Sequence, residues 1–193
     1  MQTIVRSHIA PLEGFLSREA GSFLAQMDDQ LRLLRERTRD LTPEDLMWQP
    51  ALGMNTIGML LAHLAIVEVW WTRFVLEGKA DFEVDDILGI GGDDDGLPLA
   101  PNAPAFPLLN GKDIAFYDDL LDRARAYLKR VAKDHPDEEM EREIPRERPD
   151  GSVRLLNVRW YYYHILEHFS GHFGQILLLK HMRHAATGER TQG

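Results

Sequence analysis

Residues 157–186, NVRWYYYHILEHFSGHFGQILLLKHMRHAA, form a long helical pattern in which apolar residues recur at three- and four-residue steps. The predicted helix starts near Asn157, and Gly188 lies just beyond its end. The same periodicity appears over residues 17–37, over 55–77, and from 114 to just before Pro136. Four long helices without an internal repeat or a domain linker predict an all-α fold, a single helical bundle over residues 1–193.

The connections between the predicted helices differ in character. Residues 41–45, with Pro43, are typical of a helix stop and a short turn. Residues 79–112 are rich in Gly, Pro and Asp, and a structureless stretch of this length is either a functional lid or a solvated insertion, of which we favour the insertion. Residues 148–152, Arg-Pro-Asp-Gly-Ser, predict a turn within a small hairpin.

The composition excludes several classes of function. The 193 residues carry a net charge of −9, but seven acidic residues fall between positions 81 and 95, where there is no Lys or Arg. The rest of the chain is nearly balanced and has no basic stripe, which argues against a nucleic-acid partner. The N-terminus has no apolar segment followed by a cleavage site, and His63 and Glu68 interrupt the longest apolar stretch. We therefore expect a cytoplasmic protein with no membrane partner.

The chain contains no cysteine, so histidine and carboxylates are left as metal ligands. Five of its eight histidines fall between positions 164 and 184. His168 and His172 share the apolar face of their helix, whereas His164 and His172 are about 12 Å apart along the axis, so one ion can take only an adjacent pair. His63 lies on the apolar stripe of residues 55–77. Two helices thus direct imidazoles toward one core, as in metal sites of helical bundles.

A structural role for these histidines is the alternative. Three inward imidazoles would be costly without partners for their nitrogens, and a shared cation supplies that partner. We therefore predict a divalent metal held by His63, His168 and His172, with a position left open for water or substrate. Imidazole suits zinc, nickel, iron and copper, of which we put zinc and nickel first.

Other side chains near the histidines are candidates for supporting roles. By rotation along the helix, Gln175 lies near the direction of His168 and is the better candidate for orienting a ligand, whereas Glu68 and Glu167 turn away from their neighbouring histidines. Glu68 and Glu167 are more typical of a solvated or helix-to-helix pair. Trp70 and Tyr161 point in the same direction as the histidine of their helix, so we predict that they line a pocket beside the metal.

Two stretches, NTIGMLLAHL at 55–64 and HILEHFSGHFGQI at 164–176, resemble the DinB/YfiT-like metalloenzymes, in particular the DUF664-like branch that includes thiol-dependent transferases and isomerases. The resemblance implies an up-down-down-up four-helix bundle, often a homodimer, with a divalent metal on His63, His168 and His172. Two departures bear on substrate choice: Phe173 stands where family members often have Arg, and the acidic loop at 79–112 is long.

The main functional hypothesis is a metal-dependent transferase or isomerase that uses a low-molecular-weight thiol such as mycothiol, bacillithiol or glutathione. Coordination to a cation deprotonates a thiol and makes it a nucleophile, and the thiol must come from a second molecule because the chain has none. Three alternatives remain open at this point: a metal-dependent hydrolase, a non-catalytic metal- or ligand-binding stress protein, and a structural bundle with buried histidines.

Overall fold

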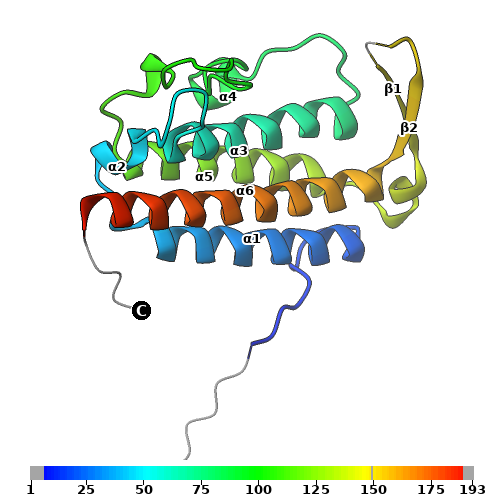
Figure 1. Ribbon diagram of the computed structural model, residues 1–193. Helices are drawn as coiled ribbons and strands as arrows, with labels where there is room; N and C mark the ends of the chain where they lie inside the picture. The colour runs from blue at the N-terminus through cyan, green and yellow to red at the C-terminus, as the bar shows by residue number, and fades with distance from the viewer. Residues whose placement is uncertain (1–6, 149, 189–193) are drawn as a thin grey trace, which may run out of the picture.

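The computed structural model describes residues 7–148 and 150–188. Residues 1–6, which entered the prediction about a leader, and Pro149 of the predicted turn lie outside the described residues. The described chain is mostly helical and has one small two-stranded sheet. Its long helices lie side by side in Figure 1, where α1 and α6 run in one direction and α3 and α5 in the other. They are α1 (Arg18–Thr38), α3 (Ile57–Trp71), α5 (Ile114–Ala132) and α6 (Val158–Thr187).

Each long helix begins at a residue whose side-chain oxygen accepts a hydrogen bond from a backbone N–H of the first turn. These caps are Ser17, Thr56, Asp113 and Asn157. At the other end, α6 stops at Gly188, whose φ of 76° lies in the left-handed region that glycine adopts without strain. All four predicted long helices are therefore present, although α3 passes into a different helix type after Trp71 and α5 ends at Ala132, before the predicted end near Pro136.

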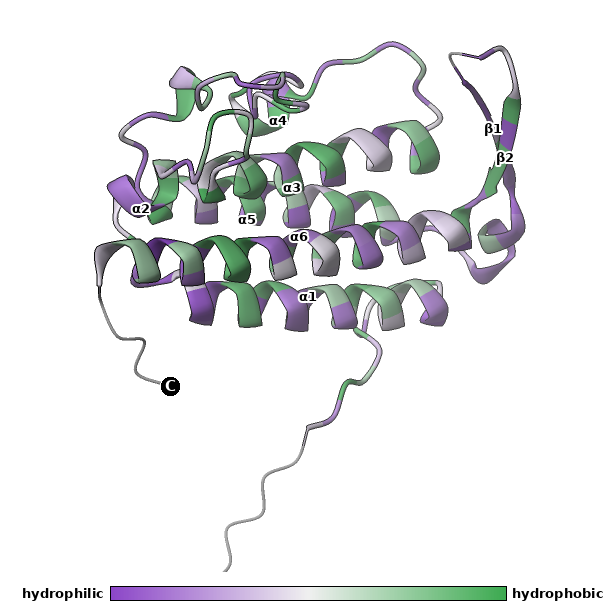
Figure 2. Ribbon diagram, in the orientation of Figure 1, coloured by the Kyte–Doolittle hydropathy of each residue, from purple (hydrophilic) through white to green (hydrophobic). Residues whose placement is uncertain are grey.

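Helix α3 continues as a π-helix, η1 (Thr72–Leu76). Residues 57–76 are long and apolar enough to cross a membrane, but 78% of their most apolar 18-residue window, which has a mean hydropathy of 1.5, is buried inside the protein. Such burial is typical of a core helix. In Figure 2, hydrophobic and hydrophilic positions alternate along α1 and α6, as expected for helices that pack on one side and face water on the other.

Two connections contain more structure than their sequence indicated. Residues 41–45 do not form a simple turn, because α2 (Pro43–Met47) begins there. The Thr42 hydroxyl accepts from the Asp45 backbone N–H, and the Asp45 carboxylate accepts from the Thr42 backbone N–H. This reciprocal cap stabilises a single helical turn that buries Leu46.

The insertion at 79–112 is not a solvated loop, which corrects our expectation. It contains α4 (Asp85–Leu88) and the 3₁₀ turn η2 (Pro107–Leu109), and it lies over α3 and α5 in Figure 1. Its apolar side chains at Val84, Leu88 and Leu109 are buried against the core. The acidic composition suggested a solvated loop. In the structure most of the acidic side chains face outward, while apolar residues between them face inward.

Arg73 anchors the start of the insertion to the helices. Its guanidinium, 7% exposed, binds both carboxylate oxygens of Asp86 at 2.6 and 2.7 Å, donates to the Tyr127 hydroxyl at 3.2 Å, and donates to the Glu83 carbonyl. A buried arginine needs such partners because an unpaired charge in the interior is costly. The insertion therefore has a fixed path across α3.

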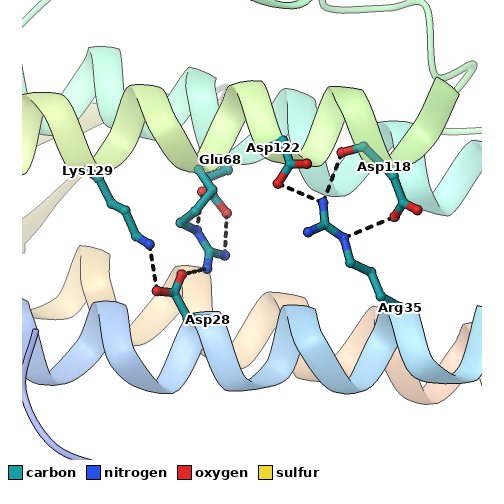
Figure 3. A network of polar contacts seen from close by, with 7 residues as sticks. Asp28, Arg35, Glu68, Asp118, Asp122 and Lys129 are labelled. Carbon is teal, nitrogen blue, oxygen red and sulfur yellow. Dashed lines mark hydrogen bonds and ion pairs between the residues drawn. The ribbon is translucent and has the colours of Figure 1, made fainter. Parts of the chain in front are cut away.

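A buried ion-pair network links the long helices (Figure 3). Arg125 on α5 donates to both oxygens of Glu68 on α3 at 2.8 and 3.0 Å and to Asp28 on α1 at 2.8 Å. Lys129 also binds Asp28, at 2.6 Å. Glu68 thus forms the helix-to-helix pair that the sequence indicated. Nearer the other end of α1, a second group joins Arg35 to Asp118 and Asp122.

The predicted hairpin is present between α5 and α6. After the 3₁₀ helix η3 (Asp137–Glu141), strand β1 (Glu143–Glu147) pairs antiparallel with β2 (Val153–Asn157). Ile144 and Leu156 are opposite each other and buried in the core cluster that includes the first part of α6. The hairpin lies at the end of the molecule where α3 ends and α6 begins (Figure 1).

Candidate metal centre and family

The three predicted ligands, His63, His168 and His172, meet between α3 and α6. One ligand atom from each lies within 4.8 Å of the others. Nε2 of His168 and Nε2 of His172 are 3.1 Å apart, and the His63 ring centroid is 5.1 and 5.0 Å from those of His168 and His172. The one-turn spacing on α6 and the apolar stripe of α3 therefore bring together the residues that the sequence singled out.

Hydrogen bonds fix the orientation of two of these imidazoles. His172 Nδ1 donates to the Gln175 side-chain oxygen at 2.8 Å, so Gln175 orients one of the predicted ligands, although it holds His172 rather than His168. His63 Nδ1 donates to the Asp95 carboxylate at 2.7 Å. In both rings the proton is on Nδ1, and the Nε2 lone pair is left for another partner.

Asp95 was not identified from the sequence. It belongs to the insertion, its side chain is 3% exposed, and its second oxygen accepts from the Leu97 backbone N–H at 2.8 Å. In the sequence it ends the run Asp93-Asp94-Asp95, and nothing local distinguishes it from its two neighbours. Its role depends on the path of the insertion across α3, which residue patterns do not encode.

Burial favours the neutral form of His168 and His172. It lowers the pKa of His168 to about 3, and the neighbouring His172, His63 and His164 lower it further in the same direction. Burial is also the main cause that lowers the pKa of His172, with the hydrogen bond to Gln175 acting in the opposite direction. A cation requires neutral imidazole, whose nitrogen lone pair is available.

The donor set fits a divalent cation. Two nitrogens bound to one tetrahedral ion at about 2.0–2.1 Å would lie about 3.3–3.4 Å apart, close to the 3.1 Å between His168 and His172. Without a cation, two nitrogens that face each other must share a proton, and only one of them can donate. The geometry therefore suits three nitrogen ligands around one ion, with further coordination positions open.

A cavity of about 450 Å³ opens beside His63. Asn55, at the start of the segment leading into α3, and Leu97, Pro98 and Leu99 of the insertion complete its wall. The insertion thus provides both the carboxylate that orients His63 and the apolar wall facing it. The volume is within the usual range for small-molecule sites.

The family model described as Mycothiol-S-transferase matches residues 22–185. This range contains all three histidines of the cluster together with Asp95 and Gln175. The chain belongs to the mycothiol S-transferase family. That family is part of the DinB/YfiT-like superfamily, so the resemblance seen in the two histidine stretches is confirmed. A comparison with curated proteins gives no match.

Membership of the mycothiol S-transferase family implies a small-molecule thiol substrate. Two aromatic residues were predicted to line its pocket. Trp70 is partly exposed and packs against Trp71, Phe74 and Phe82, with ring centroids 5.3 to 5.6 Å apart. Tyr161 is fully buried, and its hydroxyl lies 2.8 Å from the Thr72 hydroxyl. Neither residue is part of the wall of the cavity beside His63.

Proposed function

We propose that this protein is a divalent-metal-dependent transferase that joins a low-molecular-weight thiol to an electrophilic small molecule. The observation that carries the proposal is the convergence of His63, His168 and His172 in a chain of the mycothiol S-transferase family. Zinc and nickel are the ions we favour, because both accept neutral imidazole. The thiol comes from outside, since the chain contains no cysteine.

A divalent cation held by the three histidines would supply one chemical effect, a lower pKa of the thiol and hence more thiolate at neutral pH. The protein's own residues supply orientation. Asp95 and Gln175 keep the protons of His63 and His172 on Nδ1, so that both Nε2 atoms face the centre of the cluster. Asp95 and Gln175 therefore fix the orientation of the two imidazoles before a ligand enters.

The cavity beside His63 is suited to the reacting ends of the two substrates. Leu97, Pro98 and Leu99 give it an apolar wall, and Asn55 lies on its other side. An apolar wall limits the access of water to an activated thiol, which favours transfer to the electrophile over reaction with solvent. The hydrolytic alternative would need a wall that admits and orients water.

We also propose the broader organisation that the family resemblance implies. The opposite directions of α1 and α6 relative to α3 and α5 support an up-down-down-up four-helix bundle. The packing of the insertion at 79–112 on the core supports one domain over residues 1–193. We propose a cytoplasmic homodimer on the basis of the resemblance.

Metal analysis of protein purified without an affinity tag tests the ligand set. We expect near-stoichiometric metal in the wild type and its loss in His172→Ala. His181→Ala is the matched control, because His181 is exposed on the same helix and outside the cluster. Stoichiometric metal that survives in His172→Ala would refute the ligand assignment, and metal-free wild type would favour buried structural histidines.

Activity is tested by incubating the metal-loaded protein with a panel of thiols and the neutral electrophile monobromobimane. We expect fluorescent product to form faster than with His63→Ala. A metal-loaded wild type that gives the same rate as His63→Ala with every thiol would refute the transferase and leave a metal-binding protein without turnover.

A further inference from the structure

A row of aromatic rings leads away from the metal centre toward the hairpin. The ring centroid of His164 is 5.8 Å from that of His168, and His164 stacks on Trp160 at 4.6 Å with an angle of 12° between the planes. Trp71 meets His164 edge to face at 5.1 Å. His164 and Trp160 are partly exposed, so the row is accessible to a ligand.

Two arginines of the hairpin lie over the far end of this row. The guanidinium of Arg154 lies 4.4 Å from the Trp160 ring centroid, and that of Arg146 lies 4.8 Å from Trp71 and 5.7 Å from Trp70. Arg146 and Arg154 are directly opposite each other in the antiparallel pair. Like charges at opposite positions of a strand pair are destabilising, so this pairing calls for a compensating interaction.

The two arginines differ from their neighbours in their ionic partners. Nearby, Arg142 pairs with Glu139. Arg159 pairs with Glu19 and Glu141. Over residues 7–148 and 150–188, by contrast, neither Arg146 nor Arg154 has an ion pair. Their side chains share the hairpin face of Ile144 and Leu156, which is turned toward the helices.

The local charge is correspondingly unfavourable without an anion. Burial lowers the pKa of Arg146, and the charges of Arg154 and Arg148 lower it further. A cavity of about 280 Å³ is lined by Arg154 and Trp160, and Glu143 also lines it, whereas Arg146 does not. This space is sufficient for a carboxylate group and its bridging waters.

We propose that Arg146 and Arg154 form a subsite for the carboxylate of a substrate whose reacting atom lies at the histidine cluster. Two planar guanidinium groups match the geometry of carboxylates, and the rings between them and the cluster offer stacking surface for the body of the ligand. The inference rests on the proposed transferase function, which it extends by naming an anionic substrate.

The helix geometry sets the size of this substrate. Trp160 and His168 are eight residues apart on α6, which corresponds to about 12 Å along the axis. A ligand that reaches from the arginines to the cluster must therefore be about as long as a tripeptide. Either the thiol or the electrophile can carry the carboxylate, and the two sources are separated by experiment.

Binding is measured without turnover, using quenching of tryptophan fluorescence. Three of the four tryptophans, Trp70, Trp71 and Trp160, lie in or beside the row, so a ligand stacked there changes the signal. S-methylglutathione, which has no free thiol, probes the thiol arm, and its dimethyl ester is the analogue without carboxylate charges, in which the ammonium group is kept. For the electrophile arm the probes are 3,5-dinitrobenzoate and 1,3-dinitrobenzene.

The variants are Arg146→Gln, Arg154→Gln and the double variant. The matched control is Arg130→Gln, because Arg130 is also an exposed arginine stacked on an aromatic ring, Tyr127 at 5.0 Å, but lies on α5 away from the hairpin. We expect at least tenfold weaker binding of the carboxylate probe in the double variant and no change in Arg130→Gln. The esters and neutral nitroaromatic should bind all variants alike, and added salt should weaken only the carboxylate probe.

The outcome also identifies the source of the anion. A loss confined to S-methylglutathione assigns the subsite to the thiol, and a loss confined to dinitrobenzoate assigns it to the electrophile. The proposal is overturned if the wild type binds neither carboxylate probe, if the double variant binds both as tightly as the wild type, or if charged and neutral probes weaken equally. Equal weakening would mean that the arginines only hold the hairpin on the tryptophans.

The activity assay with a neutral thiol and a neutral electrophile separates this proposal from the transferase itself. If the subsite is right, the double variant's KM for the charged substrate rises at least tenfold more than its KM for the neutral pair. Wild-type protein that binds the carboxylate probes but turns over no pair would retain the anion subsite and refute the transferase.

Discussion

Replacing Asp95 tests how the insertion controls the metal centre. Asp95→Ala removes the acceptor of the 2.7 Å hydrogen bond from His63 Nδ1 and leaves the Leu97 backbone N–H without its 2.8 Å partner. His63 is then free to rotate and to move its proton to Nε2, the atom that would bind the cation. Both changes oppose coordination by His63.

The expected size follows from the contact that is lost. A hydrogen bond to a charged group is worth about 1.5–3 kcal/mol, and loss of the partner of a metal-bound histidine lowers metal affinity by about 10–100-fold, or about 1.4–2.7 kcal/mol. The two ranges agree because Asp95 is almost fully buried, so that water does not readily replace it. We expect Asp95→Asn to fall between Ala and the wild type, since an amide oxygen still accepts but carries no charge.

Competition with a chelating dye measures the zinc affinity of each variant, and circular dichroism confirms that each is folded. Asp93→Ala is the matched control, because it removes the same charge two residues away from an exposed side chain that makes no hydrogen bond to another described residue. The reasoning fails if Asp95→Ala binds zinc as tightly as the wild type. It also fails if Asp93→Ala weakens binding equally, because the effect would then be that of net charge and not of the His63 contact.

Three further predictions concern the stability of the folded chain. Arg125→Met should lower the free energy of unfolding by about 3–5 kcal/mol in urea titrations, because Glu68 stays buried without its partner, and adding Glu68→Leu should restore part of this loss. Tyr162→Phe should raise the free energy of unfolding by about 1 kcal/mol, and with it the melting temperature, because the buried Tyr162 hydroxyl has no hydrogen-bond partner among the described residues. A lower melting temperature would contradict this. Burial lowers the pKa of His135 below 6.5, so the folded state resists protonation and stability should fall as the pH drops below about 6.5. His135→Gln should reduce the difference between urea titrations at pH 7.5 and pH 5, and an unchanged difference would refute the assignment.

The parts of the molecule that the sequence predicted are those that depend on local periodicity. Four long helices and the inward direction of His63, His168 and His172 follow from the 3.6-residue repeat. Gln175 follows from the same repeat, because it lies three residues beyond His172 on one helix. Such features need no knowledge of how distant segments meet.

What the sequence did not show depends on contacts between segments far apart in the chain. Asp95 reaches His63 across 32 residues, and only the anchoring of the insertion by Arg73 brings it there. The opposition of Arg146 and Arg154 requires the register of the hairpin, which a turn signal does not specify. Acidic composition was also misleading, since an outward-facing charge and a buried hydrogen-bond acceptor are the same residue type in a sequence.

The division of labour between helices and connections explains where substrate choice would be set. The histidines lie on α3 and α6, whose positions are fixed by core packing and by the Arg125–Glu68 pair. The cavity wall at Leu97–Leu99 and the arginines of the hairpin lie on the two connections, at opposite ends of the row of rings. A rigid histidine cluster with variable walls would allow one chemistry to serve different substrates. Exchanging either connection should therefore change which thiol or electrophile is used. Among the exchanged residues, only Asp95 of the insertion should affect the metal affinity.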